Sequence, residues 1–308
     1  MGAKTTKPHN EMSFLDHLEE LRWHLIRSTL AVVIIGIIAF VFSGFVFDVI
    51  IFGPSRMDFP TYKFFCEAAT YINIESDFCK DKLPFTIQSR TMSGQFSADI
   101  WTAIWGGIIL GFPYILYELW KFISPGLYEK ERKHSRGFIF IASFLFFLGV
   151  LFGYYIVAPL SINFLGTYKV SEMVLNEFDL DSYIGTVRSA VLACGVLFEL
   201  PIIIYFLTKV GLVTPEILKK YRKIALVLVL ILSAVITPPD VASQIIVAIP
   251  VLILYQASIH ISGRVLKNEA KRERKAAEKV KAEKAKAEKA RAAAKAKADR
   301  ENTDIKLK

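Results

Sequence analysis

The sequence has few residues of the kinds that carry out chemistry or bind metals. Its histidines are scattered without metal-ligand spacing: His9, His17, His24, His134 and His260. There is no glycine-rich phosphate loop and no nucleophile elbow, and there are only three cysteines. We therefore expect no catalytic residues, no metal site and no cofactor, and we do not expect an enzyme.

Long polar stretches are also scarce in the first 262 residues, which argues against an ordinary soluble protein. The chain of 308 residues is 53% hydrophobic. Six apolar runs could enter a bilayer, of which the last two are short. They are residues 29–52, 100–119, 137–158, 184–207, 224–236 and 245–261. We expect an all-α polytopic membrane protein with six spans. A re-entrant hairpin in place of the last two is the alternative, but it would leave backbone groups unsatisfied in lipid.

The positions of Lys and Arg predict the orientation of the spans. Segments 121–136 and 209–223 are rich in both residues, whereas 159–183 carries only Lys169 and 237–244 carries none. The rich segments are expected in the cytoplasm, which places both termini there too. The first 28 residues are polar and the run after them is long, so we expect no cleavable signal peptide.

Two cysteines lie in the predicted outer loop, residues 53–99. Outside the cytoplasm, Cys66 and Cys79 could form a disulfide, and closing so short a loop is worth about 3 kcal/mol. The alternative is two free thiols. Cys194 lies within a span, where packing is its expected role.

The C-terminal segment differs in composition from the rest of the chain. Residues 263–308 carry the whole formal net charge of +9, in Lys/Ala/Glu-rich repeats that form no apolar stripe. We expect two regions, a membrane domain (1–262) and a solvated, partly helical or disordered cytoplasmic tail (263–308). Weak attraction to anionic lipid is the alternative for the tail. We expect no nucleic-acid partner.

Glu199 lies near the centre of the fourth apolar run, in "VLFELPIII". A charge at that depth costs about 2.5–3.5 kcal/mol, so this carboxyl group needs a proton or a partner. Either a backbone carbonyl satisfies a protonated Glu199, or a polar group of a partner helix does. Pro201 lacks a backbone donor and is expected to bend the helix. Arg188 is a second intramembrane charge, for which the sequence suggests no role.

Two further carboxylates lie in predicted cytoplasmic segments. Residues 13–28 are amphipathic and predict a helix at the membrane surface that leads into the first span. On it, Glu20 is either solvated with His24 one turn away or presented to a cationic partner. Glu131, in the segment 117–136, allows the same choice between local ion pairing and an acidic contact.

Four motifs together carry a family resemblance. "HLEELR" (17–22), "FPYILYELWKFISPGLYEKERK" (112–133), "FELP" (198–201) and "TPPDVASQIIVAIP" (237–250) resemble the TatC subunit of the twin-arginine protein translocase. The resemblance implies a concave six-span bundle in the bacterial cytoplasmic (inner) membrane. It also implies a receptor that binds twin-arginine signal peptides, associates with itself and exports folded proteins with TatA/TatB-type single-span partners, using the proton-motive force.

The resemblance also assigns roles to residues of this chain. Glu20 and Glu131 would hold the arginine pair, and Glu199 would face a partner helix. Other residues implied at the peptide site are Leu18, Arg22, Phe122 and Pro125, and further polar residues of the intramembrane set are Asp240 and Gln244. The chain departs from the family pattern at His24, where an Arg is frequent, and at Gln256, where an acid is common.

Two other functions fit the sequence less well. A proton-coupled small-solute transporter could use Glu199, but it would be expected to show internal repeats and more polar groups at midplane. A passive membrane scaffold would not need Glu20 and Glu131.

Overall fold

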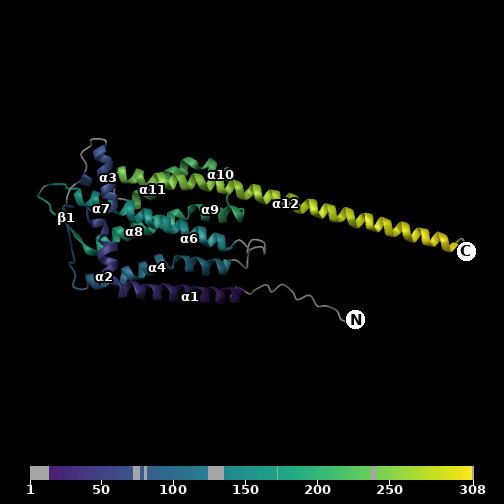
Figure 1. Ribbon diagram of the computed structural model, residues 1–308, viewed down its shortest axis with the longest axis horizontal. Coiled ribbons are helices and arrows are strands. Elements are labelled where there is room, and N and C mark those ends of the chain that lie inside the picture. Colours follow the sequence, from purple (N-terminus) through teal and green to yellow (C-terminus); the bar gives the residue numbers. More distant parts are fainter. Residues whose placement is uncertain are drawn as a thin grey trace. The chain divides into compact units, whose positions relative to one another are not determined.

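The computed structural model describes residues 14–71, 77–79, 82–123, 135–171, 173–236 and 241–306, and these are predominantly helical (Figure 1). Five helical segments are long and apolar enough to cross a membrane. They are Leu18–Val41, Gly94–Ile123, Gly137–Thr167, Leu180–Lys209 and Gln244–Lys289. The predicted class, an all-α polytopic membrane protein, is confirmed. The fifth predicted span has 15 residues in the structure, fewer than a full span needs, and the count of six stays a prediction.

The elements of the first half of the chain are α1 (Phe14–Val41), α2 (Ser43–Phe45), η1 (Val46–Ile51), η2 (Gly53–Ser55), α3 (Pro60–Tyr71), η3 (Asp77–Cys79), β1 (Phe85–Gln88) and α4 (Gly94–Ile123). Those of the second half are α6 (Ser135–Phe152), η5 (Gly153–Val157), α7 (Ala158–Thr167), β2 (Asn176–Asp179), α8 (Leu180–Phe198), α9 (Leu200–Lys209), α10 (Pro215–Lys220), α11 (Arg222–Ile236) and α12 (Val241–Lys306).

The amphipathic segment 13–28 was expected to lead into the first span, and α1 runs through it without interruption to Val41. Its location at the membrane surface stays a prediction. One expectation about a helix end is wrong. The tail was expected to be partly helical or disordered, but α12 continues past Gly263 to Lys306. Its Ala, Lys and Glu residues have a high intrinsic helix propensity, which favours helix even at positions that no other segment covers. The division at residues 262 and 263 stays a prediction.

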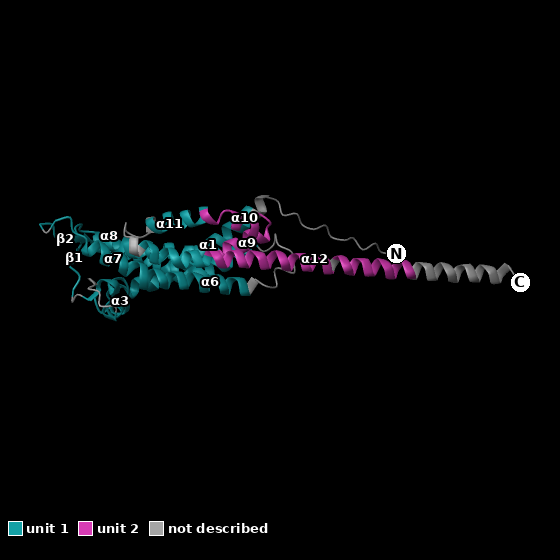
Figure 2. Cartoon of the chain, turned by 90° about the horizontal axis from the view of Figure 1, so that it is seen from above, with its two compact units in different colours: residues 1–200, 224–254 teal, residues 201–223, 255–308 magenta. Residues whose placement is uncertain are grey.

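The chain forms two compact units, coloured separately in Figure 2. Unit 1 contains residues 1–200 and 224–254, and unit 2 contains residues 201–223 and 255–308. The boundaries fall inside α9, α11 and α12, so each unit holds parts of these helices.

Within unit 1, α1 and α4 pack closely because glycine is present where their backbones meet. A Cβ on Gly107 of α4 would lie 2.5 Å from the Val32 carbonyl oxygen, and one on Gly36 of α1 would lie 3.2 Å from the Ala103 carbonyl oxygen. Lipid offers no hydrophobic force between helices, so close backbone approach at small residues is what holds such pairs together.

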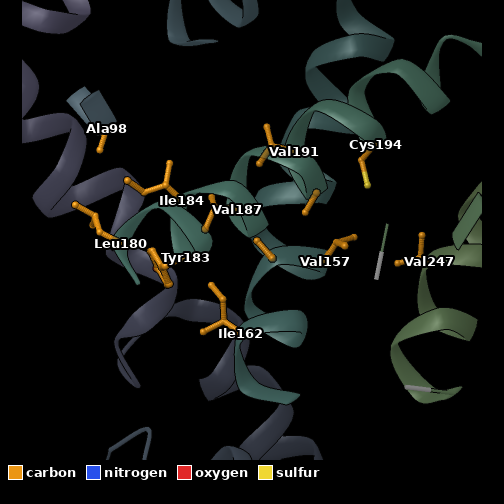
Figure 3. Packing of buried hydrophobic residues seen from close by; sticks show 12 residues of the cluster. Ala98, Val157, Ile162, Leu180, Tyr183, Ile184, Val187, Val191, Cys194 and Val247 are labelled. Carbon is orange, nitrogen blue, oxygen red and sulfur yellow. The ribbon is translucent and has the colours of Figure 1, made fainter. Parts of the chain in front are cut away.

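The main core of unit 1 surrounds α8 (Figure 3). Buried residues of this helix, among them Ile184, Val187 and Val191, pack with Ala98 of α4 and Ile162 of α7. The neighbouring segment "GVLFG" (149–153) again supplies two glycines. A Cβ at either one would come within 3 Å of the α8 backbone, so these glycines permit the contact.

The predicted outer loops contain more structure than the sequence suggested. β1 and β2 pair in parallel from Phe85↔Asn176 to Gln88↔Asp179, and this joins residues of the loops 53–99 and 159–183. Tyr62 of α3 is fully buried, and its hydroxyl lies 2.7 Å from the carbonyl oxygen of Pro54 and 3.0 Å from that of Pro159. Burial raises the pKa of Tyr62, so the hydroxyl keeps its proton as a donor.

Unit 2 consists of the end of α9, α10 and the C-terminal part of α12, held by polar contacts. The Thr208 hydroxyl donates to the Ser262 hydroxyl at 2.9 Å, and the Tyr255 hydroxyl donates to the Leu218 carbonyl oxygen at 2.8 Å. Gly211, with φ +80°, makes the turn that follows α9.

Candidate functional site

The structure describes only some of the residues predicted at the site. Glu131 and Pro125 of the peptide site and Asp240 of the intramembrane set lie outside the described residues. Their roles stay predictions. Leu18 and Arg22 are exposed on α1, and Phe122 is half-buried near the end of α4.

Glu20 lies in the second turn of α1 and is half-buried. Its Oε2 atom is shielded from solvent, and no hydrogen-bond partner for it exists among the described residues. The interpretation of Glu20 as a solvated carboxylate is therefore wrong for this oxygen. A buried acceptor without a donor costs free energy, which a cationic ligand would recover.

His24 does not turn toward Glu20, which lies one helical turn away on α1. Its Nδ1 atom lies 2.5 Å from Oε2 of Glu118 on α4, and both residues are buried, at 6% and 3% exposure. The Tyr114 hydroxyl donates to the same carboxylate, and the Phe122 ring meets the imidazole edge-on at 6.2 Å between centroids. These contacts join α1 to α4 beside the position of Glu20.

Sequence reasoning missed Glu118, although a signal for it was present. It is an acidic residue inside the apolar run "YILYELWKF", just as Glu199 is in its own run. A carboxylate in such a run needs a partner. The sequence thus indicated that Glu118 needs a partner, but not which residue it is.

Glu199 lies where the fourth predicted span is interrupted. α8 ends at Phe198, and the Glu199 N–H donates back to the Val196 carbonyl oxygen at 3.1 Å before α9 begins at Leu200. The break falls where Pro201 predicted a bend. The side chain is 8% exposed and accepts a hydrogen bond from the Phe146 backbone. Its Oε1 atom has no partner in the described part of the chain, so one oxygen is available to another donor.

Gln244, from the same predicted intramembrane set, has a partner within unit 1. Its amide nitrogen donates to the Leu230 carbonyl oxygen at 3.0 Å, which ties the start of α12 to α11.

In the predicted outer loop, Cys66 and Cys79 form a disulfide with 5.0 Å between their Cα atoms. Within the described ranges, His, Cys, Asp and Glu side chains form no group of three that could hold a metal ion.

Comparison with known sequences agrees with the motifs. The family described as "Sec-independent protein translocase protein (TatC)" matches residues 16–250. The TatC protein of Blattabacterium sp. subsp. Periplaneta americana is 47% identical over 261 residues, which cover 84% of this chain and 98% of that protein. The TatC protein of Aquifex aeolicus is 34% identical over 266 residues, covering 86% of this chain and all of that protein.

Comparison with solved structures gives the same result. One crystal structure of the twin-arginine translocase receptor TatC is similar with a TM-score of 0.59 at 31% identity, covering 81% of this chain and 99% of that one. A second, of the same receptor in DDM, has a TM-score of 0.60 at 34% identity and covers 80% and 99%. This is a family of translocase components, not of catalytic enzymes. The chain is therefore a multi-pass membrane protein that belongs to the TatC family of Sec-independent protein translocase proteins.

Proposed function

We propose that this chain is the receptor for twin-arginine signal peptides in the cytoplasmic membrane of a bacterium. The observation that carries the proposal is the Glu20 carboxylate. Its Oε2 atom is buried and has no hydrogen-bond partner among the described residues, on a stretch of α1 whose neighbours Leu18 and Arg22 are exposed. An acceptor in that state is suited to a cationic donor from outside the chain.

Two carboxylates on separate elements suit a pair of guanidinium groups. Arginine binds carboxylate through two parallel hydrogen bonds, which lysine cannot reproduce. With Glu20 on α1 and Glu131 in the segment that follows α4 in the sequence, the site would select for both the charge and the spacing of the ligand. Leu18, Arg22, Phe122 and Pro125 would surround the bound peptide.

Further partners would act at the intramembrane carboxyl group. We propose that TatA/TatB-type single-span subunits donate a polar group to Glu199, whose Oε1 atom has no partner among the described residues. In lipid such a bond contributes only about 0.6–2 kcal/mol, but it fixes the register of the helices. Export of folded cargo would then use the proton-motive force, with several receptor copies in one complex. A small-solute transporter is not proposed, because the matched family consists of translocase components.

The test is crosslinking of a photoreactive twin-arginine signal peptide to the full chain in membranes. Glu20→Gln keeps the shape of the side chain and removes its charge. Losing one partner of a desolvated pair costs about 2–5 kcal/mol, so crosslinking should fall at least tenfold. Glu131→Gln should have a similar effect.

Glu19→Gln is the matched control, because Glu19 is the adjacent carboxylate and is exposed. It should crosslink at the wild-type level, and a Lys-Lys peptide should crosslink poorly to every variant. Wild-type crosslinking by both Glu20→Gln and Glu131→Gln would refute the receptor site.

A further inference from the structure

Glu20 and His24 are four residues apart on α1, the spacing at which two side chains on one helix face meet. By spacing, the imidazole is therefore one of two that α1 offers to the Glu20 carboxylate, the other being His17, three residues before it. The structure instead shows His24 in contact with Glu118, at 2.5 Å, while Oε2 of Glu20 has no partner among the described residues. The contact between His24 and Glu118 thus occurs together with a Glu20 oxygen that has no hydrogen-bond partner in the described part of the chain.

Burial and a second hydrogen bond stabilise the contact between His24 and Glu118. Both side chains are buried, and the Glu118 carboxylate also accepts a hydrogen bond from Tyr114. A buried carboxylate is stable only with donors in good geometry, and breaking such a contact leaves an uncompensated group behind. His24 can donate to Glu118 whether the imidazole is neutral or protonated. The imidazole is therefore held away from Glu20 in both states.

The other charged and titratable groups that face this pair do not replace Glu118. Tyr114 and Lys121 on α4 act on Glu118, and Arg27 on α1 and Tyr117 on α4 act on Tyr114. Glu20 belongs to this group by its spacing, four residues before His24 on α1. Lys121 and Arg27 are cations and cannot accept a hydrogen bond from an imidazolium. Tyr114 is already a donor to Glu118. If Glu118 lost its charge, Glu20 is the carboxylate within this group to which a protonated His24 would turn.

We propose that Glu118 is a positioning residue for peptide binding, which holds His24 away from Glu20 and so keeps that carboxylate open for a guanidinium group of the signal peptide. The inference rests on the proposed role of Glu20 as a receptor residue. It assigns a function to a buried pair that touches no ligand itself.

The test compares peptide crosslinking at two pH values in the full chain in membranes. Glu118→Gln keeps the side-chain shape and weakens the contact to His24, because a neutral amide oxygen accepts a weaker hydrogen bond than a carboxylate. Acid favours the imidazolium, so at about pH 6 crosslinking should fall about two- to fivefold below the wild-type level as His24 pairs with Glu20. At about pH 8 crosslinking should be close to the wild-type level.

Replacing His24 as well should restore peptide crosslinking to the Glu118→Gln variant. Glu118→Gln combined with His24→Gln removes the imidazole that Glu118 holds in the wild-type protein, and crosslinking should recover at both pH values. Tyr114→Phe, which keeps the Glu118 charge, is the matched control and should behave as wild type. A merely structural role for Glu118 predicts the opposite pattern, with loss at both pH values and no recovery in the double variant, and this outcome would overturn the proposal.

Two further variants separate the possible failures. If Glu118→Gln does not insert into the membrane, His24→Lys with Glu118→Gln is compared with the double glutamine variant. A permanent cation at position 24 must then lower crosslinking at both pH values. If Glu20→Gln and Glu131→Gln both crosslink at the wild-type level, the receptor site itself is refuted. If Glu20→Gln abolishes crosslinking while Glu118→Gln is neutral at both pH values, only the positioning role is lost.

Discussion

The guanidinium carbon of Arg188 on α8 lies 5.5 Å from the centroid of the Trp105 ring on α4. The sequence suggested no role for this charge inside an apolar run. The ring face carries negative charge density, so it can stabilise a cation where water is scarce. The partner of Arg188 is therefore an aromatic ring on another helix.

This contact predicts a coupling between the two residues. Trp105→Leu and Arg188→Gln should each lower the unfolding temperature of the detergent-solubilised protein. The free energy of unfolding lost in the double variant should be smaller than the sum of the two single losses, by about 1–2 kcal/mol. Trp101→Leu, at an exposed ring one turn away on α4, is the control and should not couple to Arg188. Additive losses for Trp105 and Arg188 would show that the ring only fills space.

The close contact of α1 and α4 predicts different effects at two adjacent glycines. Gly107→Ala would place a methyl group 2.5 Å from the Val32 carbonyl oxygen, which forces the helices apart. Overpacking of this kind costs about 1–3 kcal/mol. Gly106→Ala would meet nothing nearer than Ala39, at 3.7 Å, and should be tolerated. Thermal unfolding in detergent measures both, and equal stability of the two variants would contradict the packing described.

The disulfide between Cys66 and Cys79 predicts a linked fragment in nonreducing peptide maps of the oxidised membrane protein. Closing this loop is worth about 3 kcal/mol, so Cys66→Ser should lower the stability of the region around α3. Limited proteolysis with and without reductant measures that loss. Cys194→Ala should keep the link. Recovery of Cys66 and Cys79 as free thiols would show that the native protein lacks the bond.

The intramembrane carboxyl group predicts a separation of binding from transport. Glu199→Ala should remain inserted and bind signal peptide, because the proposed peptide site uses residues of other segments. It should lose crosslinks to single-span partners at this level and lose export, since the Glu199 Oε1 atom no longer accepts their polar group. Glu216→Ala, at an exposed carboxylate of α10, should export normally. Normal export by Glu199→Ala would make this residue a tolerated part of the core.

Much of the fold could be predicted because a bilayer imposes local rules. A helical membrane span needs a continuous apolar run, and within such a run a helix satisfies the backbone hydrogen bonds without another segment. Both requirements can be read from consecutive residues. The break beside Pro201 was predictable for the same reason, because the missing N–H belongs to that residue alone.

The partners of the polar side chains could not be predicted, because they depend on which helices pack together. Local spacing pairs His24 with Glu20, yet His24 contacts Glu118, 94 residues away in the sequence. That choice follows from the approach of α1 to α4, which Gly107 permits. The parallel pairing of β1 with β2 joins two loops that show no common signal in the sequence. Residue types and apolar runs therefore determined which segments are helices and which carboxylates need partners. The packing of those helices decided that Glu118 is the partner of His24. The physical reason is that a hydrogen bond acts only over about 3 Å, a distance that tertiary contacts alone bring about between residues far apart in the chain.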